Sequence, residues 1–203
     1  MVSGIKKSFC DSSLLIDLKL GYESTFNKFL ESQDRVFIAD TVKYELKNLL
    51  KKLEAYEHLY IDLFLPNQKI DIIYAKDFSS EELTVIEATL KQFDMGVSLI
   101  NQEICPDLGE FVSALYSKYK DINVVRTSDK KFISRYGNNY IFKNIKFINL
   151  ESTLDEFLDN KDKEETLIKI RSGNENFNEH KNEYRLNKSK EDLMRRFQKH
   201  KLS

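Results

Sequence analysis

Short apolar runs alternate with amphipathic stretches along most of the chain, and this alternation constrains the fold more than any other feature. The runs are rich in Val, Ile and Phe, as buried strands are. They lie at residues 5–10, 35–39, 70–74, 123–125 and 145–148. Parallel neighbouring strands need crossover connections, which are usually helices. The alternation therefore predicts a three-layer α/β/α sandwich with a central, mainly parallel sheet of about five strands.

The stretches between these runs carry apolar residues at helical spacing, and several begin with a capping residue. Ser79 is placed as an N-cap with Glu82 at the capping-box position, and Asp40 and Thr41 both suit the start of a helix. Helices are predicted at residues 12–20, 23–30, 42–53 and onward to about 65, from 79, 106–119, 130–136 and 152–158.

The 203 residues suffice for one α/β domain and an appendage. Beyond Asn160 the hydrophobic content falls, so we divide the chain into a domain at 1–159 and a C-terminal extension at 160–203, expected to be a basic, helical or disordered arm. A helix at 185–200 would have one apolar side, which could dock on a partner subunit. That side would carry Leu186, Leu193, Met194 and Phe197.

The overall charge does not indicate a partner, because the chain has 32 Lys and Arg and 33 Asp and Glu. From Lys161 onward, however, 12 Lys and Arg face 8 Asp and Glu, so this part has a net charge of +4 and the remainder −5. An acidic body with a basic tail suits a protein that gathers carboxylates in one site and holds an anionic polymer elsewhere. A basic tail is also commonly just a solvated face.

Other classes of protein find little support. Cys10 and Cys105 lack metal-ligand spacing and indicate free thiols in a reducing cytosol. No apolar run reaches the length of a membrane span, and no signal-peptide core is present, so a cytoplasmic protein is expected. The three histidines are isolated and indicate neither a metal site nor a catalytic triad; they are His58, His180 and His200.

Four acidic residues lie where such a fold would bring them together. Asp11 and Asp129 each follow a predicted strand, Glu45 lies one turn into the helix after the second strand, and Glu110 lies in the first turn of the helix before the fourth. These positions face the crevice at the carboxyl ends of the strands. Packed carboxylates repel one another unless a cation lies among them, and hard oxygen ligands suit Mg²⁺ or Mn²⁺.

Each acid also has an ordinary explanation. Asp11 and Asp129 could cap the helices that follow them, Glu110 could act on the helix dipole, and Glu45 could be a solvated surface acid. Three further acids near the same ends are interpreted as surface or capping residues, namely Asp17, Asp34 and Asp40.

Four pieces of the sequence resemble the PIN-domain family. They are FCDSSLLID at 9–17, VKYEL at 42–46, DLGE at 107–110 and TSDKKF at 127–132. They occur in the family's order with roughly its spacing, and they cover the chain to about residue 159. No single piece is specific; the resemblance depends on the set of four, each in its expected strand or helix context.

PIN domains are metal-dependent nucleases that act mostly on RNA, and many are toxins of toxin–antitoxin pairs. The resemblance implies that Asp11, Glu45, Glu110 and Asp129 are catalytic ligands of Mg²⁺ or Mn²⁺, with an RNA substrate and, for a toxin, an antitoxin partner. Ser13 and Thr127 would be supporting hydroxyls. In the third motif Asp107 competes with Glu110; we favour Glu110, which follows Gly109, and leave Asp107 as a second ligand or a helix cap.

Basic residues near the last acid are candidates for holding the substrate backbone. They are Lys130, Lys131 and Arg135, with Arg195 and Arg196 of the extension as further phosphate contacts. A preference for RNA over DNA follows only from the resemblance. The competing interpretation is a catalytically silent PIN-like binding or assembly module, against which the presence of all four acids argues. A phosphotransfer receiver lacks its acidic pair and central phosphoacceptor here.

Overall fold

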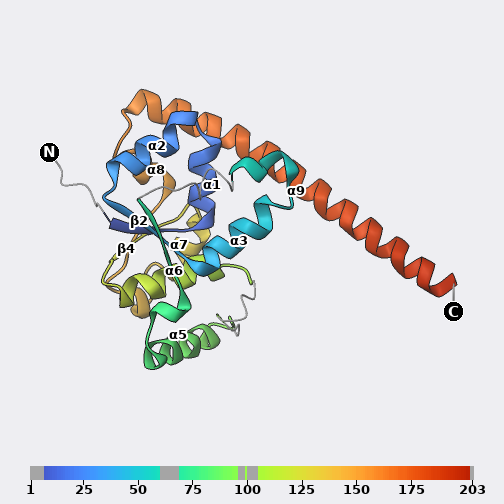
Figure 1. Cartoon of the computed structure of the whole chain (residues 1–203). Coiled ribbons are helices and arrows are strands. Elements are labelled where there is room, and N and C mark those ends of the chain that lie inside the picture. The colour runs from blue at the N-terminus through green and yellow to red at the C-terminus, as the bar shows by residue number, and fades with distance from the viewer. Residues whose placement is uncertain (1–6, 60–68, 96–98, 100–104, 202–203) are drawn as a thin grey trace.

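A single five-stranded sheet forms the centre of the molecule, which we describe from a computed structural model at residues 7–59, 69–95, 99 and 105–201 (Figure 1). Its strands are β1 (Lys7–Cys10), β2 (Arg35–Ala39), β3 (Ile70–Ile73), β4 (Val124–Arg126) and β5 (Lys146–Ile148). The strand order is β3-β2-β1-β4-β5, and every neighbouring pair is parallel. The predicted fold class is confirmed; the predicted start of the first strand at Ile5 lies outside the described residues.

Helices cover both faces of this sheet, with α1 and α2 on one side and α5 and α6 on the other (Figure 1). The helices are α1 (Ser12–Leu20), α2 (Glu23–Ser32), α3 (Asp40–Leu50), α5 (Ser80–Gln92), α6 (Leu108–Tyr119), α7 (Lys130–Tyr136), α8 (Leu150–Leu154) and α9 (Asn160–Lys201). Short 3₁₀ turns occur at Glu54–Tyr56, Ala75–Asp77 and Tyr140–Phe142. The predicted helical stretch to residue 65 lies partly outside the described residues. Within the described ranges, no helix combines the length and apolar character needed to cross a membrane.

The core explains why the strands read as apolar runs. Phe9 of β1 pairs in register with Phe37 of β2 and Val125 of β4, and both Phe9 and Val125 are fully buried. A sheet covered on both faces buries the side chains of both faces, so strict alternation disappears. Helix α6 is buried along most of its length, from Leu108 to Ser117, because it packs against β1, β2 and β4.

The strand order reverses between β1 and β4, which lie side by side although their residues are more than 100 positions apart. The backbone N–H of Asp11, just past β1, donates to the carbonyl of Arg126 at the end of β4 at 3.1 Å. In open parallel sheets the ligand site lies at this switch point, beyond the carboxyl ends of the strands.

Helix starts agree with the sequence in part. Ser79 caps α5 and Glu82 completes its capping box, as predicted. Asp40 is instead the first residue of α3, with Ala39 at the N-cap position. Asp40 is buried, and its Oδ2 accepts the backbone N–H of Ala75 at 2.8 Å. Its interpretation as a surface or capping residue is therefore wrong: it ties α3 to the end of β3.

Asp17 is likewise buried rather than a surface residue. The side-chain Nδ2 of Asn174 in α9 donates to its Oδ1 at 2.7 Å, which joins α9 to α1. The interpretation failed because Asn174 lies 157 positions away in the sequence. Cys10 and Cys105 are free thiols, as expected.

The C-terminal extension is one continuous helix, α9, of 42 residues. Its first half runs along α1, with Ile170 and Phe177 buried, and a Cβ at Gly173 would lie 3.0 Å from Cβ of Leu20. Its second half projects away from the body (Figure 1). The extension is therefore helical, and its first half packs against the α/β body. The division at residue 159 stays a prediction.

Candidate metal centre

Asp11 lies at the junction of β1 and α1 and is fully buried. Its Oδ1 accepts the backbone N–H of Leu14 at 2.8 Å, which caps α1. Its Oδ2 accepts the hydroxyls of Ser13, at 2.8 Å, and of Thr127. Both explanations considered for Asp11 thus have a structural basis, because it caps a helix and also lies at the switch point with a second oxygen held by two hydroxyls.

Glu45 reaches the same place from the second turn of α3. The hydroxyl of Ser12 donates to its Oε2 at 3.0 Å, and the backbone N–H of Gly109 donates to the same carboxylate. A Cβ at position 109 would lie 2.6 Å from Oε2 of Glu45. Gly109 therefore lets the first turn of α6 approach this carboxylate directly.

Glu110 comes from that first turn of α6 and is 9% exposed. Burial raises its pKa to about 10, and the charge of Asp11, the hydrogen bond that it shares with Asp11, and the charge of Glu45 add to the effect. At neutral pH Glu110 is therefore protonated and donates to Asp11. This proton lies between two carboxyl groups, a position that a cation could take.

Burial also raises the pKa of the other two acids. The pKa of Glu45 rises to about 7, chiefly because it is desolvated, and the charge of Asp11 adds to this. The pKa of Asp11 is raised by burial, against the hydrogen bonds that it accepts from Thr127, Leu14, Glu110 and Ser13. Three acids from three separate elements thus interact in one cluster, in which Asp11 and Glu110 are buried and Glu45 is half-buried.

Asp129 is joined to this cluster through Thr127. Its backbone N–H donates to Oγ1 of Thr127 at 2.9 Å, and that hydroxyl donates to Asp11. Its Oδ1 caps α7 by accepting the N–H groups of Lys131, at 2.7 Å, and Phe132, at 2.9 Å. Among the described residues no group donates to Oδ2, so this oxygen is available to a ligand.

Asp107 is turned to another partner. It has a φ of 62° at the start of α6, makes no side-chain cap, and forms an ion pair with Arg135 at 2.7 Å. Asp107, the alternative metal ligand, and Arg135, one of the predicted substrate-binding cations, are therefore paired with each other. The roles of both residues stay predictions.

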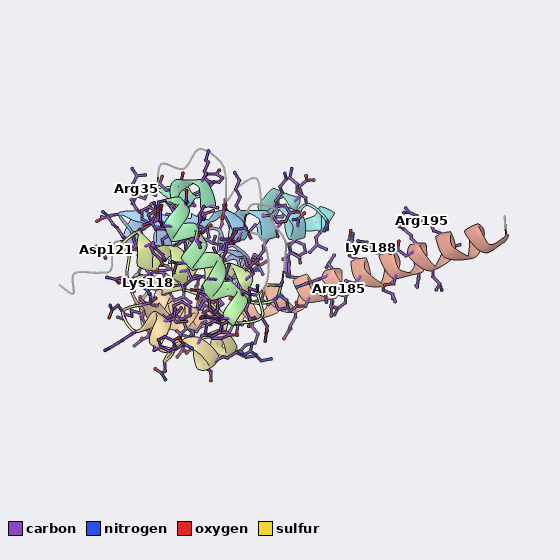
Figure 2. All side chains as sticks on the ribbon, turned by 90° about the horizontal axis from the view of Figure 1, so that it is seen from below. Arg35, Lys118, Asp121, Arg185, Lys188 and Arg195 are labelled. Atoms are coloured by element: carbon purple, nitrogen blue, oxygen red, sulfur yellow. The ribbon has the colours of Figure 1, made fainter. Side chains whose placement is uncertain are left out.

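The other predicted substrate-binding cations lie on the surface. Lys130 forms an exposed ion pair with Glu151 at 2.7 Å, and Lys131 is exposed beside it. Arg195 is exposed on the projecting half of α9 (Figure 2). Arg196 belongs to the same helix, but its side chain lies outside the described residues.

Carboxylate oxygens are the ligands that Mg²⁺ and Mn²⁺ prefer, so the donor chemistry of the cluster fits such an ion. As the side chains stand, no group of three or more His, Cys, Asp or Glu in the described part of the chain is arranged to hold a metal. The two oxygens of Asp11 are engaged by four hydrogen-bond donors, including Glu110. A cation would therefore have to displace the Glu110 proton and draw the carboxylates towards itself.

Sequence reasoning missed two residues at this place. Ser12 lies within the quoted motif, yet its hydrogen bond to Glu45 spans 33 positions and has no local signal. In the sequence, Gly109 was used only as the residue before Glu110. The structure shows that the absence of a side chain at Gly109 leaves the space that the Glu45 carboxylate occupies. A glycine in the first turn of a helix, where helix formers are favoured, was the available signal.

Comparison of this chain with family models, with curated proteins and with solved structures gave no match in any of the three.

Proposed function

We propose that this protein is a divalent-metal-dependent endoribonuclease that cleaves RNA phosphodiester bonds at the cluster of Asp11, Glu45 and Glu110, with Asp129 as a fourth ligand. The observation that carries the proposal is the convergence of three acids from separate elements at the switch point of the sheet, where Asp11 and Glu110 are buried and joined by a hydrogen bond. Buried acids are costly unless they are paired or bind a cation. Asp11 just past β1, Glu45 of α3 and Glu110 of α6 come together here, and this arrangement supports a site that binds a cation.

A bound Mg²⁺ or Mn²⁺ would activate water and neutralise charge on the scissile phosphate. The chain's own residues have the task of orienting the carboxylates. Thr127 and Ser13 hold Asp11, while Ser12 and the N–H of Gly109 hold Glu45. A carboxylate of the cluster that the ion leaves partly free would orient the attacking water.

The test is cleavage of a mixed RNA pool by purified protein. Mn²⁺ or Mg²⁺ should support cleavage, a chelator should stop it, and Ca²⁺ should support it poorly because calcium prefers looser, higher coordination. Asp11→Asn and Glu110→Gln should abolish cleavage. Asp121→Asn is the matched control, because Asp121 is exposed and Asn tolerates its φ of 57°. Undiminished cleavage in chelator, or by Asp11→Asn, would overturn the proposal.

The choice of RNA and a role as a toxin depend on the resemblance to PIN domains. If the chain is a toxin, its expression alone should arrest growth, and the Glu110→Gln form should not. Unimpaired growth with high levels of active protein would instead indicate a regulated or housekeeping nuclease.

A further inference from the structure

A groove of about 370 Å³ opens beside the acidic cluster, between α3 and the C-terminal helix α9. Ser12 and Glu45 are among the residues that line it, so the groove adjoins the candidate metal centre. The opposite wall belongs to α9, which lies outside the segment that resembles PIN domains. This wall exists only because Asn174, Ile170 and Phe177 hold α9 against the body.

Three cations line the groove, and Glu45 is its only acid. Lys52 lies just past the end of α3, and Lys181 and Arg185 lie one turn apart on α9. Among the described residues none of the three cations forms an ion pair. Like charges at positions i and i+4 of a helix destabilise it, and here burial together with the charge of Arg185 lowers the pKa of Lys181. An anion in the groove would relieve this repulsion.

The remaining surface of the groove is mostly apolar. Tyr184 is half-buried, lies between the two cations of α9 in the sequence, and lines the groove together with Leu49 and Leu53. Asn48 also lines the groove, and its Nδ2 has no hydrogen-bond partner among the described residues. An aromatic ring flanked by cations is a combination with which proteins bind single-stranded nucleic acids, through base stacking and phosphate contacts.

We propose that this groove is a subsite for the single-stranded nucleotide next to the scissile phosphate. A base stacks on Tyr184, and backbone phosphates contact Lys52, Lys181 and Arg185. The volume is at the lower end of the ~300–1,000 Å³ of small-molecule sites, which suits one nucleotide. The subsite rests on the proposed nuclease function, because its position is defined by Glu45.

The test is a binding titration of a short, labelled single-stranded RNA across salt concentrations, in chelator so that no cleavage occurs. Lys181→Gln/Arg185→Gln should weaken binding and reduce the magnitude of the salt slope by about 1.4, at roughly 0.7 per lost phosphate contact. The control Lys91→Gln/Lys118→Gln removes two exposed cations from α5 and α6 and should leave affinity and slope close to wild type. Figure 2 shows Lys118 on the body, well separated from Arg185.

Tyr184 is tested by a second pair of variants. Tyr184→Leu should weaken RNA binding about 5- to 150-fold, the range expected for loss of one stacked base, whereas Tyr184→Phe should retain it. Thermal unfolding shows whether Tyr184→Leu loosens α9. If it does, Tyr184→Phe and Lys181→Gln/Arg185→Gln still test the proposal.

Failure of the subsite and failure of the nuclease proposal are distinguishable. If the wild type cleaves RNA but the Tyr184→Leu and double Gln variants bind and cleave normally, the subsite is wrong and the nuclease stands. If the wild type never cleaves but binding depends on these residues as described, the nuclease proposal is wrong and the groove is a binding site for single-stranded RNA with no scissile phosphate beside it. If the wild type binds no single-stranded RNA, the subsite is overturned, and an acidic peptide becomes the ligand to test.

Discussion

A Cβ atom at Gly109 would lie 2.6 Å from Oε2 of Glu45. The Glu45 carboxylate can therefore contact the backbone of residue 109 in this position only because that residue is a glycine. The N–H of Gly109 also donates to that carboxylate. One glycine therefore sets how closely α3 and α6 bring their acids together.

Gly109→Ala should displace Glu45, because the atom that the new methyl group meets is the far end of a flexible side chain. We expect Mn²⁺-dependent cleavage to fall at least tenfold, while the free energy of unfolding changes by less than about 1 kcal/mol. The control is Ser113→Ala on the same helix, which removes a buried hydroxyl that has no partner among the described residues. Full activity of Gly109→Ala would show that Glu45 is not needed where it lies.

The metal-free protein should lose stability as the pH rises. Burial raises the pKa of Glu45 to about 7 and that of Glu110 to about 10, from an ordinary value of 4.5. The folded state thus keeps protons that the unfolded chain releases, so the stabilisation is complete below pH 4.5 and is lost through about 7 and then about 10. Thermal unfolding in chelator should show the melting temperature falling from about pH 5 to pH 9.

Glu110→Gln should fall less steeply over this range, since it cannot ionise, and Mg²⁺ should restore wild-type stability mainly at the upper end. Identical pH profiles for wild type and Glu110→Gln would contradict the assignment of that proton.

Glu156→Ala should destabilise the fold strongly. Nη2 of Arg126 donates to Oε2 of Glu156 at 2.8 Å, and the arginine side chain is fully buried on β4. Removing the acid takes away the carboxylate that the buried guanidinium contacts, which costs about 3 kcal/mol or more. Glu151→Ala breaks an exposed ion pair with Lys130 and should cost less than about 1 kcal/mol. Urea unfolding of both variants is the measurement, and equal losses would mean that Arg126 does not depend on Glu156.

Two truncations should behave differently. Removing residues 187–203 takes away only the projecting half of α9 and should leave the melting temperature nearly unchanged. Removing residues 160–203 exposes the surface that Ile170 and Phe177 bury, and at about 1.5–3 kcal/mol for each side chain it should destabilise the body.

The shorter truncation also removes Arg195 and Arg196. If these residues contact phosphates, as the sequence predicts, RNA affinity at low salt should fall and the salt slope should flatten. An equally stable 160–203 deletion would show that α9 is an independent arm.

The sequence by itself determined the layered α/β architecture and most of its elements. Buried strands and amphipathic helices have different periods, and those periods are local properties of the chain, as the apolar runs around Phe9 and Val125 show. The capping box of Ser79 and Glu82 is local in the same sense. So is the placing of Asp11 directly after β1 and of Asp129 three residues past the end of β4, because both positions depend only on where a strand ends.

Only the tertiary structure decided which polar groups meet. Glu45, Gly109 and Asp11 come from three separate elements, and the contacts among them depend on interatomic distances that no local pattern encodes. Arg126 and Asp17 are buried because distant partners, Glu156 and Asn174, compensate their desolvation. The groove beside Glu45 likewise exists only because α9 folds back over α1. The first half of α9 has few apolar residues, so the residues of the body that it contacts determine how this helix packs.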